Sequence, residues 1–210
     1  MIDQETVQKS YEAAAAIYAR FGVDTDAVLA QMKKIDISLH CWQGDDVTGL
    51  ESAGGGVSGG IMSTGQYPGK ARTGDELRAD IDKAMSLLPG RQRLNLHASY
   101  AELDGEPVDR DAYETRHFTR WIDWAEQRGI ALDFNPTCFG HPLAADNLTL
   151  AHPDEKIRRF WINHCIASRR IAADIGRRLG KPVVNNIWVP DGMKDMPSDR
   201  LYYRRLLRDS

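Results

Sequence analysis

The sequence predicts an α/β fold, specifically the first four βα units of a (β/α)8 TIM barrel that follow an N-terminal helical extension. Four short apolar stretches alternate with amphipathic helical stretches, which is the pattern of a parallel sheet wrapped by helices. Each apolar stretch ends in polar or aromatic side chains, as strands do at the functional edge of such a sheet. The chain has 210 residues, whereas a complete eightfold barrel typically takes about 250.

Residues 1–35 form the predicted helical extension, and residues 36–210 form the predicted N-terminal half of a barrel. Residues 4–21 carry apolar side chains at three- and four-residue steps, and Gly22 ends that helix. A second, short helix is expected from about Thr25 to Lys34. Both helices precede the first predicted strand.

The barrel half begins with a predicted strand at 36–42, and later strands are expected to end at His97 and to cover 130–135 and 182–189. Thr73 and Glu76 form a capping box that begins a helix. Further helices are predicted from about Tyr113 to Gln127, from Pro153 to Leu179 and from the cap Ser198 onward.

A long glycine-rich loop is expected from Gly44 to Arg72. Residues 54–59 satisfy G-x-G-x-x-G, but they neither directly follow a strand nor open a helix, so a dinucleotide site is disfavoured. A segment of this length in a compact domain is usually either an active-site flap or a disordered connector. Both alternatives stay open from the sequence.

The formal net charge of -3 gives no general attraction to nucleic acid or to an anionic membrane surface. The sequence shows neither a signal peptide nor a membrane span, so a cytoplasmic protein is expected. Cys41, Cys138 and Cys165 match no zinc-ligand spacing, and we expect buried, reduced thiols. His164 lies among apolar helix positions, which favours a core histidine over a ligand.

Several side chains at the predicted strand ends are candidates for binding a small polyol, namely Trp42, His97, Asp133, Asn135 and Trp188. Indole faces pack on the C–H faces of a sugar, while imidazole, carboxylate and amide groups hydrogen-bond its hydroxyls. Alternatively, the tryptophans plug the barrel mouth and Asp133 holds a loop. The first strand ends in His40-Cys41-Trp42 without a second histidine, so no complete metal site and no catalytic residue is assigned.

Longer motifs containing these residues resemble the L-rhamnose isomerase family over essentially the whole chain. They include the stretches 40–46, 67–71, 94–98, 132–136 and 188–195. The resemblance implies an eightfold barrel that interconverts L-rhamnose and L-rhamnulose with a divalent metal, usually manganese, and that assembles as a cytoplasmic homotetramer. It implies that the sugar pocket is lined by Trp42, His97, Phe139 and Trp188.

The resemblance also implies that the glycine-rich loop closes over an active site, either its own or that of a neighbouring subunit. The family's metal ligands and its catalytic lysine lie on later strands, so the 210 residues are expected to be an N-terminal half that is inactive alone. The competing hypotheses are a non-catalytic half-barrel that binds a sugar or pairs with another chain through open strand edges, and another sugar-phosphate or epimerase barrel.

Overall fold

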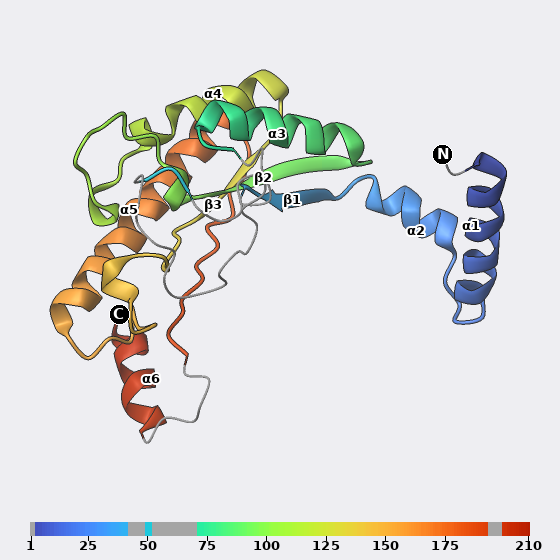
Figure 1. The fold of residues 1–210 in the computed structure, drawn as a ribbon. Helices are drawn as coiled ribbons and strands as arrows, with labels where there is room; N and C mark the ends of the chain where they lie inside the picture. Colours follow the sequence, from blue (N-terminus) through green and yellow to red (C-terminus); the bar gives the residue numbers. More distant parts are fainter. Residues whose placement is uncertain (1–2, 42–48, 52–70, 193–198) are drawn as a thin grey trace. The chain divides into compact units, whose positions relative to one another are not determined.

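The computed structural model describes residues 3–41, 49–51, 71–192 and 199–210 (Figure 1). The chain divides into two compact units. The first comprises Met1–Ile37 with Leu88–Arg91, and the second comprises Ser38–Leu87 with Gln92–Ser210. Trp42 and the G-x-G-x-x-G stretch lie outside the described residues.

The first unit contains the two predicted N-terminal helices, α1 (Gln4–Ala19) and α2 (Thr25–Met32). Each begins at an aspartate whose side chain accepts a hydrogen bond from a backbone N–H of the first turn, which satisfies one of the free donors there. The hydroxyl groups of Tyr11 and Thr25 lie 3.0 Å apart and link the helices. No residue of either helix is buried, so their apolar side chains are largely exposed.

The second unit is organised by a three-stranded sheet in the order β1-β2-β3. These strands are β1 (Asp36–His40), β2 (Arg91–His97) and β3 (Leu132–Asn135). Strands β2 and β3 are parallel, and their register places His97 opposite Asn135. The carboxyl ends of neighbouring strands therefore meet at one edge, as the sequence predicts.

The fourth predicted strand, at 182–189, is reduced to a single parallel bridge between Asn185 and Phe134. Backbone hydrogen bonds flank this bridge, from Phe134 N to Val184 O at 2.9 Å and from Asn186 N to Phe134 O at 2.8 Å. The ladder stays short because Pro182 has no N–H to donate and Val184 N donates to the Asp133 carboxylate instead. Four complete βα units are therefore not present among the described residues.

Helices α3 (Gly74–Leu87), α4 (Thr119–Arg128) and α5 (Glu155–Leu179) accompany the sheet, and α6 (Arg200–Asp209) lies near the end of the chain (Figure 1). Short 3-10 helices occur at Ala98–Tyr100, Arg110–Ala112, Thr115–Phe118 and Pro142–Ala144. The predicted helix from Tyr113 to Gln127 thus begins later, at Thr119. Its first part is a 3-10 helix because the backbone N–H of Glu114 donates to the ring of His117.

The caps also differ in detail from the predictions. Thr73 Oγ1 accepts from Glu76 N at 3.2 Å, but the Glu76 carboxylate accepts from Arg72 N and not from Thr73 N, so only half of the predicted capping box forms. Pro153 precedes α5, whose cap is Asp154. Asp199 caps α6, and Ser198 lies outside the described residues.

Strand alternation divides the sheet into an apolar and a polar face. The apolar face packs against α3, α4 and α5, with its core formed by the buried side chains of Leu94, Leu96, Leu132, Phe134, Leu77, Ile81, Trp121, Ile122, Ile171 and Ile175. A second cluster contains Cys138 and Cys165. The three cysteines are buried and free, as predicted. The polar face carries Ser38 and His40 on β1, and Asn95 and His97 on β2.

Candidate functional site

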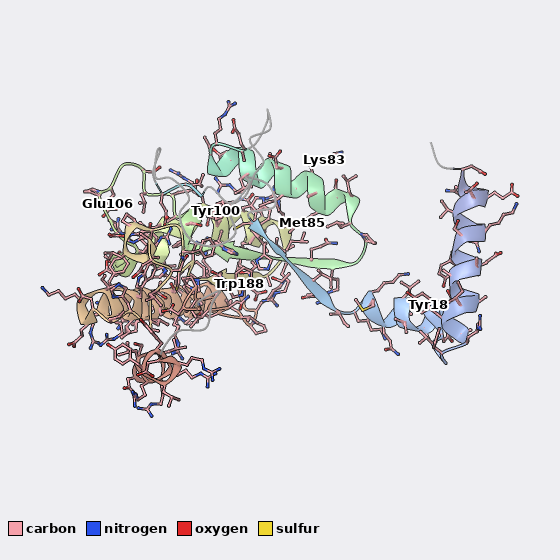
Figure 2. All side chains as sticks on the ribbon, turned by 60° about the horizontal axis from the view of Figure 1, so that its bottom comes forward. Tyr18, Lys83, Met85, Tyr100, Glu106 and Trp188 are labelled. Atoms are coloured by element: carbon pink, nitrogen blue, oxygen red, sulfur yellow. The ribbon has the colours of Figure 1, made fainter. Side chains whose placement is uncertain are left out.

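Two histidines and a tryptophan meet at the carboxyl ends of the strands. His40 ends β1 and His97 ends β2, and the two rings are joined by a contact of 3.1 Å between His40 Nδ1 and His97 Nε2. The indole of Trp188, which is labelled in Figure 2, has its centroid 4.9 Å from that of the His40 ring and 5.8 Å from that of the His97 ring. Trp188 follows the bridged segment, so three neighbouring stretches of chain deliver this cluster to one edge.

His97 is the most enclosed member of the cluster, with 1% of its surface exposed. Its ring stands edge-on to Tyr100 at 6.5 Å, and its backbone N–H donates to Cys41 Sγ at 3.3 Å. Burial, with a smaller contribution from His40, lowers the pKa of His97 from 6.5 to about 3. Burial also lowers the pKa of His40. Both rings are therefore neutral near pH 7, and in their shared contact one nitrogen donates and the other accepts.

The neutral state of His97 predicts a measurable pH dependence. The unfolded chain takes up a proton near pH 6.5 and the folded chain only near pH 3, so the stabilisation is complete above 6.5 and is lost as the pH falls toward 3. The slope for one group is at most about 1.4 kcal/mol per pH unit. We expect the free energy of unfolding to fall less steeply with acid in His97→Gln than in the wild type, measured by urea titration at several pH values. Identical slopes would contradict the assignment.

Asp133 is a predicted candidate for sugar binding, but its carboxylate oxygens already accept hydrogen bonds from other residues of the protein. Arg93 donates from Nη2 to Asp133 Oδ1 at 2.6 Å and from Nε to Oδ2 at 3.0 Å. Ser38 Oγ donates to Oδ2 at 2.7 Å, and Val184 N donates to Oδ1 at 2.9 Å. These contacts favour the structural alternative, in which Asp133 ties all three strands and the bridged segment together.

Asn135 is committed to the scaffold through its amide oxygen, whereas its Nδ2 is buried without a hydrogen-bond partner among the described residues. Its Oδ1 accepts from Thr137 N at 2.8 Å and shapes the turn that follows β3. Arg93 was not recognised in the sequence, although it alternates with Asn95 and His97 along β2 and so shares their polar face. This alternation at every second residue is the signal in the sequence that places Arg93 on the polar face.

Phe139 lies in the loop after β3, and its carbonyl accepts from Arg110 Nη1 at 2.6 Å. The contribution of its ring to a sugar pocket stays a prediction, as does that of Trp42. Asp191, in the motif that begins with Trp188, accepts from Thr149 N and Ala151 N at 2.6 Å each. It therefore connects the end of the bridged segment to the loop that precedes α5.

His164 is a core histidine, as predicted. It is fully buried in α5, and its ring nitrogens contact the carbonyl oxygens of Arg110 and Pro136. Burial lowers the pKa of His164 to about 4. Within the described part of the chain, no group of three or more His, Cys, Asp or Glu side chains is placed to hold a metal ion.

None of the helices in the described ranges is both long enough and apolar enough to cross a membrane.

The fold and the cluster together define the class of this protein. It is a parallel α/β protein in which imidazole and indole side chains gather at the carboxyl edge of the sheet, where proteins of this class place their binding sites.

Comparison with known proteins identifies the family. The family model described as L-rhamnose isomerase matches residues 5–210. Curated L-rhamnose isomerases from Pectobacterium carotovorum subsp. carotovorum and Pectobacterium atrosepticum are 56% identical to the chain over 201 residues, and that from Cronobacter sakazakii is 54% identical. Each alignment covers 96% of this chain and 48% of the relative. The chain belongs to the L-rhamnose isomerase family, and it spans about half the length of these curated relatives.

Proposed function

We propose that this chain supplies the sugar-binding wall of an aldose–ketose isomerase that interconverts L-rhamnose and L-rhamnulose. The observation that carries the proposal is the cluster of His40, His97 and Trp188 at the carboxyl edge of the sheet. Membership of the family supplies the substrate class. Phe139 and Trp42 complete the proposed lining.

The chemistry of the cluster suits a neutral polyol. An indole offers an apolar face to the C–H groups of a sugar. A histidine whose pKa is lowered to about 3 meets hydroxyl groups as a neutral ring, and in the His40–His97 pair one nitrogen of each ring is taken by their shared contact. In this proposal, Trp188 orients the sugar, and the contact with His40 fixes the orientation of the His97 ring.

We infer that the second unit is the beginning of a (β/α)8 barrel whose interior is the polar face of the sheet. Manganese, which the family resemblance implies, does not fit the described residues, because they include no set of three suitable ligands. We therefore assign it no step here and propose that its ligands lie elsewhere in the protein. A cytoplasmic homotetramer is proposed on the same resemblance.

A second candidate is a non-catalytic half-barrel that pairs with another chain. The bridged segment supports it, because Val184, Ile187 and Val189 are exposed β-branched residues beside a strand edge. Such an edge favours pairing. A concentration-dependent dimer seen by light scattering, with no response to sugar, would favour this candidate over the first.

The test is a titration of the chain with L-rhamnose and with its enantiomer, measured by isothermal titration calorimetry. We expect the chain to prefer L-rhamnose, and we expect Trp188→Phe to weaken that binding by up to roughly tenfold, because the smaller phenyl ring keeps only part of an aromatic contact worth about 0.5–1.5 kcal/mol. Trp124→Phe, a change in α4 at a ring that contacts Trp121 and Arg128 and not the cluster of His40, His97 and Trp188, should leave the affinity unchanged.

The 210 residues alone should not convert L-rhamnose to a ketose when manganese is added. A colorimetric assay for the ketose measures this. Equal affinity for the two enantiomers, or an unchanged affinity in Trp188→Phe, would contradict the assigned pocket.

A further inference from the structure

Arg110 lies at the start of the 3-10 helix Arg110–Ala112, between β2 and α4, and it is one of the most buried charged residues described, with 3% of its surface exposed. All five N–H donors of its guanidinium are engaged. Nε and Nη2 donate to the two carboxylate oxygens of Glu51 at 2.8 and 2.6 Å. The remaining donors contact three carbonyl oxygens in the loop after β3, those of Thr137, Phe139 and Gly140 at 2.5, 2.6 and 3.3 Å.

The Glu51 carboxylate has a second hydrogen-bond partner besides Arg110. Its Oε1 also accepts from Tyr113 OH at 2.7 Å. The residues before it are docked on the turn after β2, where Leu50 N donates to Ser99 O at 2.7 Å. Gly49 has a φ of +77°, and a Cβ built there would lie 2.5 Å from Ser99 O. Only glycine fits this approach, so residues 49–51 have one closely defined position on the second unit.

The loop that Arg110 contacts has an unusual backbone. Thr137 has a φ of +59°, in the left-handed region that a β-branched residue rarely adopts. Its side chain accepts from Ser99 N at 3.4 Å, and its N–H donates to Asn135. His164 contacts the carbonyl of Pro136, just before this loop, and the carbonyl of Arg110. The guanidinium is therefore the group on which three carbonyls of this loop converge.

The energetics favour a positional role for this ion pair. Taking an ion pair out of water is costly, and an apolar replacement of similar volume is often as stable. Burial alone would lower the pKa of Arg110, but Glu51 raises it above the ordinary value, so the guanidinium stays charged. The planar guanidinium has five donors in fixed directions and can align several carbonyls and a carboxylate at once, whereas an apolar side chain has no donor and a lysine has three on one freely rotating nitrogen.

We propose that Arg110 and Glu51 are a positioning pair for the sugar site, which fix the backbone of residues 137–140, and with it Phe139, and join this loop to residues 49–51 of the connection after β1. The role for sugar binding rests on the proposed function. The inference that the pair fixes the geometry of the loop is independent of the proposed function. The pair thereby holds residues 137–140, which follow β3, and residues 49–51, which follow β1, in fixed positions relative to each other.

The experiment compares the buried ion pair of Arg110 and Glu51 with an exposed arginine–glutamate pair in the same part of the chain. Arg110→Lys and Glu51→Gln are the test variants. Arg116→Lys and Glu106→Gln are the matched controls, because Arg116 also makes a two-pronged contact with Glu106 but its side chain is 56% exposed. Tyr113→Phe removes a single donor to Glu51 and serves as a mild variant that should fold. Amide hydrogen exchange is followed at Thr137 and Leu50, together with the affinity for L-rhamnose.

We expect Arg110→Lys and Glu51→Gln to speed exchange at both amides by about tenfold or more, because hydrogen bonds to charged groups are lost. Tyr113→Phe should have a smaller effect, and both controls should have none. The affinity for L-rhamnose should fall by severalfold in the test variants at temperatures where all variants remain folded. Ethylguanidine added to Arg110→Ala should restore both amide protection and affinity.

Each result has a distinct meaning. If the amides of Thr137 and Leu50 exchange as slowly in Arg110→Lys as in Arg116→Lys, the proposal that Arg110 positions the loop is wrong. Faster exchange with an unchanged rhamnose affinity overturns the role in the sugar site. If the wild-type chain does not respond to L-rhamnose, the proposed function fails for this chain, and the claim about the loop is decided by amide exchange alone.

Discussion

Replacing Asp133 by alanine should lower the free energy of unfolding of the second unit by about 3–5 kcal/mol, because it leaves the charge of Arg93 buried without its partner. The two side chains are only 6% and 14% exposed. Arg93 Nη2 also donates to the Pro182 carbonyl at 2.6 Å, and the Asp133 carboxylate accepts from Ser38 and Val184. The change therefore removes the contacts that tie β1, β2 and the bridged segment to β3. Urea unfolding followed by circular dichroism measures the loss.

The control is Asp123→Ala, which breaks an ion pair with Arg178 whose side chains are 44% and 41% exposed. An exposed pair is typically worth about 1 kcal/mol or less. The double variant Arg93→Met with Asp133→Leu removes both charges and should recover most of the stability lost in Asp133→Ala. Equal losses in Asp133→Ala and Asp123→Ala would show that the Arg93 charge is not effectively buried.

Asp133 also shows what sequence reasoning can and cannot supply. Its place on a buried parallel strand follows from apolar patterning, but the structure puts it at the second residue of β3, opposite Asn95, and not at the carboxyl end opposite His97. Whether its carboxylate faces a ligand or a cation depends on Arg93, 40 residues earlier in sequence. No local pattern reports such a pairing. The sequence therefore left two alternatives for Asp133, and the structure favours the structural one.

The helices were predicted more reliably than the strands, for a physical reason. The apolar period and the ends of α5 are local signals, and only its first residues differ from the prediction. A strand, by contrast, needs a partner. The segment at 182–189 has suitable β-branched residues but gains only one bridge, because Asp133 takes a backbone N–H of that segment.

The site was predicted in part. His97 and Trp188 were both selected and are brought together, but His40 was considered only as half of a missing metal-binding pair. Its contact with His97 arises from the pairing order of the strands, which places the ends of β1 and β2 side by side. Alternation along β1 puts Ser38 and His40 on one face, so the pattern was consistent with this role but did not require it.

Trp121→Ala should be the other strongly destabilising change, at about 3–5 kcal/mol. Trp121 is fully buried in α4, its ring lies edge-on to Tyr100 at 6.4 Å, and the Arg78 guanidinium lies 4.8 Å from its ring centroid. Its Nε1 donates to Tyr100 O at 3.0 Å. The substitution removes the largest side chain beneath the sheet and leaves that carbonyl without its donor. Circular dichroism is the suitable probe, because the change also alters tryptophan fluorescence.

A pair of phenylalanine variants separates the hydrogen bond from the packing. Trp121→Phe keeps an aromatic ring but loses the donor to Tyr100 O, whereas Trp124 Nε1 has no hydrogen-bond partner among the described residues, so Trp124→Phe loses none. We expect Trp121→Phe to be more destabilising by about 1 kcal/mol or more. The Tyr100 ring also packs edge-on against His97, so Trp121→Phe should loosen His97 and make its ring titrate at a higher pH in proton NMR. Equal stabilities of the two variants, with an unchanged His97 resonance, would mean that the core beneath the sheet does not support the site at its edge.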